Sequence, residues 1–159
     1  MLRRWHHVTG LVLTAALVTS SCGDKEPEGP TVIEAEQTLK AHINKLVGTG
    51  VGNVRHVKVI DPGGRNIPCG KDKAKRTYAV SGDKNDPKKD DLSFNSTDLA
   101  NHMFANLIAN VGEYDVVDPD RDGAITKTRN SATHTNITIR AHGERVVEIY
   151  GSTDCLPSG

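Results

Sequence analysis

The chain has 159 residues, and its 20 lysines and arginines are balanced by 20 aspartates and glutamates. Arg3 and Arg4 fall in a leader of 21 residues, so the remainder carries an excess of two acidic residues. That remainder is long enough for one domain with its own hydrophobic core. Its charge argues against nucleic acid as a partner, because nucleic acid requires a basic face.

The leader has the three parts of a secretory signal. Arg3 and Arg4 form a basic start, residues 11–18 form an apolar run, and Ser20 and Ser21 are the small residues before a cleavage point. The apolar run is too short to span a bilayer, which requires about 20 apolar residues. Residues 1–21 are therefore predicted to be a signal peptide.

The stretch that ends at Cys22 resembles the lipobox of bacterial lipoproteins, in which a cysteine after small residues is acylated and becomes the new N-terminus. Thr19 stands where this family usually has leucine. The resemblance implies acyl chains such as palmitate on Cys22. Two or more chains would hold the protein on the outer face of a membrane. The alternative is a plain secreted protein that is cut near Ser21.

Residues 22–30 are polar and rich in glycine and proline, which predicts a flexible tether before a single domain at 31–159. With Cys22 assigned to lipid, Cys69 and Cys155 remain, and in an oxidising compartment they predict a disulfide. The two thiols could instead form half of a metal site, but no C-x-x-C spacing supports this alternative.

The first predicted helix covers residues 32–47. Thr31 and Glu34 form a T-x-x-E capping box at its start, and its apolar residues recur at helical spacing as far as Gly48. A core-facing helix is favoured over a partner surface.

Alternating and β-branched residues then predict strands at 54–60 and 74–80, separated by the Asp61-Pro62-Gly63-Gly64 turn and a loop that contains Cys69.

A second helix is predicted over 96–111. Asn95 caps it, Asp98 favours its dipole, and Phe94 and Leu99 are placed for a hydrophobic staple. Further strands are predicted at 114–117, 124–128, 133–141 and 146–150. The resulting class is α+β. We expect an antiparallel sheet of about five strands with two helices packed on one face, in the order helix, two strands, helix, then three or four strands.

The residues Asp118, Asp120 and Asp122 match the start of a calcium loop, D-x-D-x-D-G. Calcium needs a later bidentate glutamate, and Arg129 occupies that position. An Asp- and Gly-rich hairpin turn explains the same residues and is favoured over a calcium site. The sequence predicts no metal ion and no cofactor.

No serine in the chain has the G-x-S-x-G frame of a nucleophile elbow. No histidines form a close metal-binding pair, although His134 and His142 could meet on neighbouring strands. Because these motifs are missing, no catalytic residue is assigned. An envelope hydrolase or a metal-dependent enzyme is kept as the alternative function.

The whole layout resembles the small, mostly uncharacterised lipoproteins of actinobacteria. The shared features are the lipobox at Cys22, a charged spacer, two helices, paired strands around Cys69 and an ending G-S-T-x-C at 151–155. The resemblance implies a cell-envelope domain with one disulfide. We expect it to bind an unknown envelope protein or a small ligand through one face of its sheet. Five residues are candidates for that face: Arg76, Tyr78, Arg140, Glu148 and Tyr150.

Overall fold

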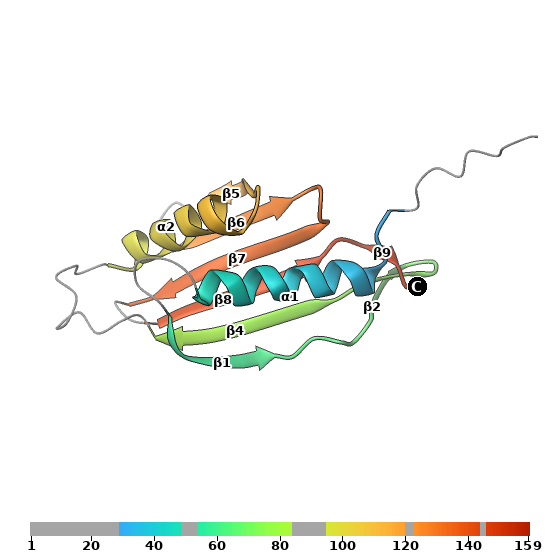
Figure 1. Ribbon diagram of the computed structural model, residues 1–159, viewed down its shortest axis with the longest axis horizontal. Coiled ribbons are helices and arrows are strands. Elements are labelled where there is room, and N and C mark those ends of the chain that lie inside the picture. Colours follow the sequence, from blue (N-terminus) through green and yellow to red (C-terminus); the bar gives the residue numbers. More distant parts are fainter. Residues whose placement is uncertain (1–28, 49–53, 84–94, 120–122, 144–145) are drawn as a thin grey trace, which may run out of the picture.

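The computed structural model describes residues 29–48, 54–83, 95–119, 123–143 and 146–159 (Figure 1). The predicted signal peptide, Cys22 and Phe94 lie outside these ranges. No helix within them is long and apolar enough to cross a membrane.

Two α-helices, one π-helical turn and nine strands make up the described part of the chain. In chain order they are α1 (Val32–Gly48), β1 (Arg55–Asp61), β2 (Ile67–Gly70), β3 (Lys73–Lys75), β4 (Thr77–Asp83), α2 (Ser96–Asn106), η1 (Leu107–Val111), β5 (Asp115–Pro119), β6 (Ile125–Asn130), β7 (Thr135–His142), β8 (Val146–Thr153) and β9 (Leu156–Pro157).

Six strands form one antiparallel sheet in the order β1-β4-β8-β7-β6-β5, and β2, β3 and β9 form a second, three-stranded sheet. The predicted α+β class is confirmed. The expected five-stranded sheet and the element order are wrong in detail. The predicted strand at 74–80 breaks at Arg76, because β3 pairs with β2 and β9 whereas β4 joins the large sheet. β2 lies in the stretch around Cys69 that was expected to be a loop.

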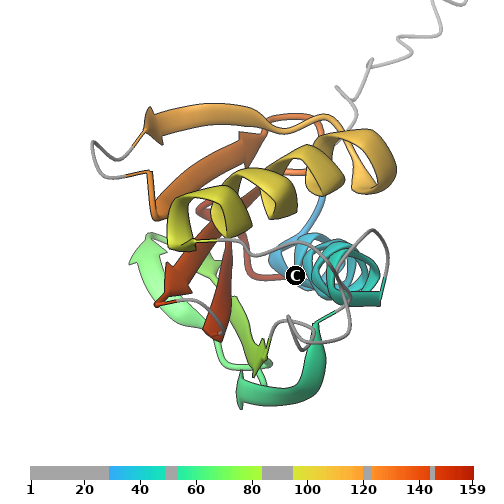
Figure 2. The same cartoon turned by 90° about the vertical axis from the view of Figure 1, so that its left-hand side faces the viewer.

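Both helices pack on the same face of the large sheet (Figures 1 and 2). α1 lies against β4, β7 and β8, and α2 lies against β6 and β7. The capping box of α1 is confirmed, since the Thr31 N–H donates to Glu34 Oε2 at 2.8 Å and the Glu34 N–H donates to Thr31 Oγ1 at 3.3 Å. Asn95 caps α2 by accepting from the Asp98 N–H at 2.9 Å.

The core fills the space between the helices and the sheet. On β7, Ile137 and Ile139 are fully buried, and on α1 Leu39 and Ile43 are fully buried against them. Gly151 lets α1 approach β8 closely, because a Cβ at this position would lie 2.6 Å from Leu39 and 2.7 Å from Ile43. The side chains on this face of the sheet are therefore buried against the two helices.

The predicted disulfide is confirmed. Cys69 in β2 is bonded to Cys155, which follows β8, across a separation of 86 residues. The bond joins the small sheet to the end of a central strand of the large one. A small apolar cluster of Val32, Ala35, Ala74 and Leu156 packs the start of α1 against the same small sheet.

Candidate functional site

One face of the large sheet is covered by neither of the two described α-helices, and we call it the open face. Its side chains alternate with the core residues along each strand. Along β7, for example, Asn136, Thr138 and Arg140 lie between the buried residues Thr135, Ile137 and Ile139.

The open face contains a hollow of about 300 Å³ over β1, β4, β8 and β7. This volume lies at the lower end of the range for small-molecule pockets. Ala79 on β4 pairs with Tyr150 on β8, and Tyr150 pairs with Thr138 on β7. Ala79 also pairs with Asp61 on β1, so its small side chain lies between two larger ones. The hollow is lined by Ile60, Asp61, Thr77, Ala79, Asn136, Thr138, Tyr150, Gly151 and Ser152.

Asp61 and Thr77 form one border of the hollow. The Thr77 hydroxyl donates to Asp61 Oδ2 at 2.5 Å, and the Gly63 N–H donates to Asp61 Oδ1 at 2.9 Å. These two hydrogen bonds hold the pKa of the Asp61 carboxyl below its ordinary value. The carboxylate is consequently ionised and fixed in position at neutral pH.

Glu36 of α1 holds the turn that carries Gly63 from the covered side of the sheet. The side chain of Glu36 is 5% exposed, accepts from the Gly64 N–H at 2.5 Å, and pairs with Arg76 at 2.7 Å and Lys40 at 2.9 Å. Burial alone would raise the pKa of Glu36, but hydrogen bonds from Arg76, Lys40 and Gly64 outweigh it and lower the pKa.

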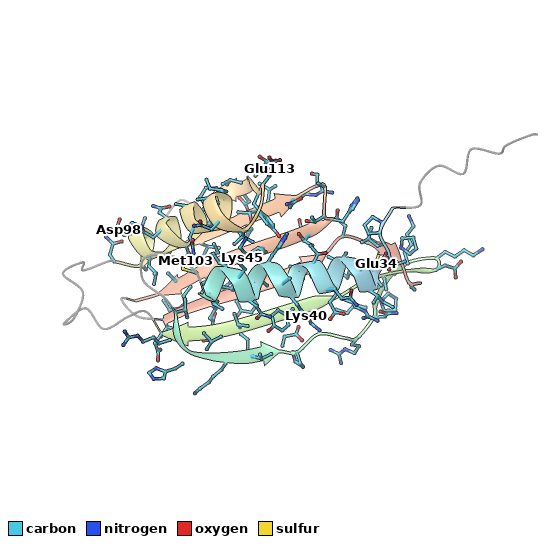
Figure 3. All side chains as sticks on the ribbon, in the orientation of Figure 1. Glu34, Lys40, Lys45, Asp98, Met103 and Glu113 are labelled. Atoms are coloured by element: carbon cyan, nitrogen blue, oxygen red, sulfur yellow. A yellow bond between two sulfur atoms is a disulfide. The ribbon has the colours of Figure 1, made fainter. Side chains whose placement is uncertain are left out.

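This contact places a buried carboxylate beside the turn next to the hollow. Figure 3 shows Lys40 on the flank of α1 that lies over β4.

A second polar group lies along β7 and β8, beside the hollow. Glu148 Oε2 accepts from the Tyr150 hydroxyl at 2.9 Å and lies 2.9 Å from His142 Nε2. Hydrogen bonds from His142 and Tyr150 lower the pKa of Glu148, and the hydrogen bond to Glu148 raises the pKa of Tyr150. The Arg140 guanidinium lies 5.7 Å from the centre of the Tyr150 ring. Tyr150 is therefore held at both its hydroxyl and its ring.

A third polar group surrounds Asp154 at the end of β8. Asn136 donates to Asp154 Oδ1 at 3.0 Å, and Arg129 donates to Oδ2 at 2.9 Å, with His134 at 3.3 Å. Burial would raise the pKa of Asp154, but the hydrogen bonds from Asn136 and Arg129 prevail and lower it. The bond to Asp154 fixes the side-chain amide of Asn136, which lines the hollow.

The five predicted binding residues divide between the two faces. Arg140, Glu148 and Tyr150 lie on the open face. The prediction is wrong for Tyr78, which is 7% exposed and packs in the core, where its hydroxyl donates to Asn44 at 3.2 Å. It is also wrong for Arg76, which lies on the sheet face that α1 covers and pairs there with Glu36. Alternation placed Arg76 and Tyr78 together correctly but did not show which face was covered.

The two histidines that were candidates for an enzyme do not meet. His134 precedes β7 and His142 ends it, so the whole length of the strand separates them. His134 contacts Asp154, whereas His142 contacts Glu148. The expectation that they lie on neighbouring strands is wrong, because His134 is the last residue of the turn before β7 and His142 is the last residue of β7 itself.

The calcium candidates are described only in part. Asp118 lies on β5 and its carboxylate pairs with Lys127 of β6. Asp120 and Asp122 lie outside the described residues. Within the described ranges no three metal-ligating side chains gather.

Sequence reasoning missed most of the hollow. Thr77, Ala79, Asn136, Thr138 and Ser152 are common residues of strands, and they come together only through the pairing of β4, β8 and β7. The Asp61-Pro62-Gly63-Gly64 turn was the one local signal, since an Asp before a Gly-rich turn often bonds its own backbone.

Comparison of the chain with protein-family models, curated proteins and solved structures gave no match. The properties of its candidate site therefore rest on its own residues.

Proposed function

We propose that this chain is a bacterial envelope lipoprotein, tethered to the outer face of the membrane by lipid on Cys22, whose α+β domain binds a ligand on the open face of its sheet. The observation that carries the binding proposal is the hollow of about 300 Å³ beside Tyr150. Pockets of this kind, with apolar walls and a few fixed polar groups, are where proteins bind small ligands.

The tether rests on separate support. Residues up to Cys22 resemble a lipobox, and the layout resembles small actinobacterial lipoproteins. The Cys69–Cys155 disulfide supports an oxidising compartment, where such bonds persist. α1 begins at Val32, directly after the polar stretch that was predicted to be the tether.

The alternative function, an envelope hydrolase or metal-dependent enzyme, is not favoured by the described geometry. Its two histidine candidates lie at opposite ends of β7. A binding domain does not require the two histidines to lie close together. The described polar groups near the hollow each hold a neighbouring side chain in place.

Intact-mass measurement of the protein from the membrane fraction tests the tether. We expect an N-terminus at Cys22 with the added mass of acyl chains, and Cys22→Ala should release the protein from the membrane. A protein that begins elsewhere, or that is unmodified and soluble, would refute the lipid anchor.

Site-specific photo-cross-linking on intact cells tests the binding face. A photoreactive phenylalanine is placed at Tyr150 on the open face, and the matched control places it at Ile108 on the helix side, where 47% of the residue is exposed. We expect adducts from position 150 only. Adducts from position 108 alone would show that the wrong face was chosen.

A further inference from the structure

We infer that the hollow on the open face binds one ring of a neutral, hydroxyl-rich ligand, that is, a sugar unit. This inference deepens the proposed function and depends on the open face being a binding face. It is drawn from the size of the hollow, the chemistry of its lining and the balance of charge around it.

The lining joins an apolar wall to a polar rim. Ala79, Ile60 and the ring of Tyr150 supply the apolar surface. A pyranose ring presents C–H groups on its faces and hydroxyls around its edge. The arrangement of one aromatic ring beside small apolar side chains therefore suits its face, whereas a wholly polar solute would gain little there.

The rim provides groups that both donate and accept hydrogen bonds. The hydroxyls of Thr138 and Ser152 and the amide of Asn136 line the hollow, and Thr77, whose hydroxyl donates to Asp61, can still accept a hydrogen bond there. A ligand hydroxyl also both donates and accepts, so each can pair with any of these groups. Asp61 adds an acceptor that Thr77 and Gly63 already hold in place.

The charge around the hollow favours a neutral ligand over an ionic one. Among the described residues that line it, Asp61 is the only one with a carboxyl or a basic group. The positive charges of Arg65 and Lys40 act on the Asp61 carboxylate. Because these charges offset each other, the hollow offers little net charge to attract either an amine or an anion.

The supporting contacts reduce the cost of ordering the site. Glu148 and Arg140 hold Tyr150, Asp154 holds Asn136, and Gly63 holds Asp61. Groups that are fixed before binding lose little conformational freedom when the ligand arrives.

Saturation-transfer NMR on the full chain, purified in a detergent without sugar headgroups, tests this inference. The probes are the methyl glycosides of glucose, galactose, mannose and N-acetylglucosamine. Two charged probes, ethylamine and acetate, are included. We expect saturation transfer to at least one glycoside and none to the charged probes.

Two variants test whether the glycoside occupies the hollow. Ala79→Leu should fill it and weaken binding at least about tenfold, whereas Ala41→Leu, at an exposed position on α1, should leave binding unchanged. Tyr150→Ala should weaken binding by a similar factor, and Tyr150→Phe should retain it because the ring remains. If Ala79→Leu fails to fold, Thr138→Val provides the test in its place. It keeps the shape of the side chain but removes its hydroxyl, and it should weaken binding.

The inference is overturned if no glycoside binds, if a charged probe binds in place of the glycosides, or if binding is equal in wild type and folded Ala79→Leu or Thr138→Val. Those results would leave the cross-linking comparison between positions 150 and 108 untouched. Failure of the sugar assignment is thus distinguishable from failure of the proposed binding face.

Discussion

The two faces of the large sheet are built from the same strands and have opposite chemistry. On the covered face, β7 and β8 present Ile137, Ile139 and Ile149, all fully buried under the helices. On the open face, the next residues along the same strands are hydroxyls, amides and charged groups. The apolar contribution to folding free energy is therefore concentrated on the covered face, and the residues of the open face are less constrained by packing.

The comparison also shows that charge is used differently on the two sides. Glu36 lies on α1 with 5% of its side chain exposed, and it joins α1 to Arg76 and Gly64. Glu148, with 24% of its side chain exposed, orients His142 and Tyr150 on the open face. The first carboxylate joins separate elements of the fold, and the second positions side chains on its surface.

Truncation of isoleucine on each face gives the largest expected contrast. Ile139→Ala on the covered face should lower the free energy of unfolding by about 2–5 kcal/mol, because it leaves a cavity in the core. Ile125→Ala on the open face of β6, where the side chain is half-buried, should cost about 1 kcal/mol. Urea unfolding measures both. Equal losses would show that the open face is packed in solution.

Added volume on each face gives the next contrast. Gly151→Ala should destabilise by about 1–3 kcal/mol, because its Cβ would press on Leu39 and Ile43 of α1. Ser152→Ala, the next residue along β8 and on the open face, should change stability by less than about 0.5 kcal/mol. Thermal unfolding of the two variants provides the comparison. A neutral Gly151→Ala variant would mean that α1 can move away from β8 without cost.

These contrasts also show what the sequence could predict. The T-x-x-E box, the cap at Asn95 and the alternation of 133–141 are local signals, and the structure confirms each one. The Cys69–Cys155 bond followed from the small number of cysteines. Tyr78 and Arg76 were assigned to the wrong surface because alternation separates two faces without saying which one the helices cover. The hollow depends on the register of β4 against β8, two strands that are distant in sequence, and of β8 against β7.

The two carboxylates give a smaller, charge-dependent contrast. Glu36→Gln should lower stability at neutral pH by roughly 1–3 kcal/mol, since Arg76 loses its buried partner. Glu148→Gln should change it by less than about 0.5 kcal/mol, as is usual for a surface pair. Both pKa values are lowered on folding, so the stability that each carboxylate contributes is present above its unfolded pKa and is lost as pH falls. Urea unfolding from pH 7 to pH 3 should therefore show a shallower acid loss in Glu36→Gln than in Glu148→Gln.

The smallest expected effect concerns two histidines on opposite sides of the molecule. His42 of α1 is half-buried, with Nδ1 2.8 Å from the buried Tyr114 hydroxyl, and burial together with Lys45 lowers the pKa of His42. The unfolded chain therefore takes up this proton at a higher pH than the folded chain does. Stability should be fully present above the unfolded value, near 6.5, and decline as pH falls below it.

Urea unfolding of wild type, His42→Gln and His142→Gln from pH 7.5 to 5.5 tests this sign. One proton sets a limit of about 1.4 kcal/mol per pH unit. We expect His42→Gln to lose part of the wild-type slope. A slope that disappears with His142 instead would place the pH-sensitive group on the binding face, and the separation of stability from surface chemistry would then fail at that strand.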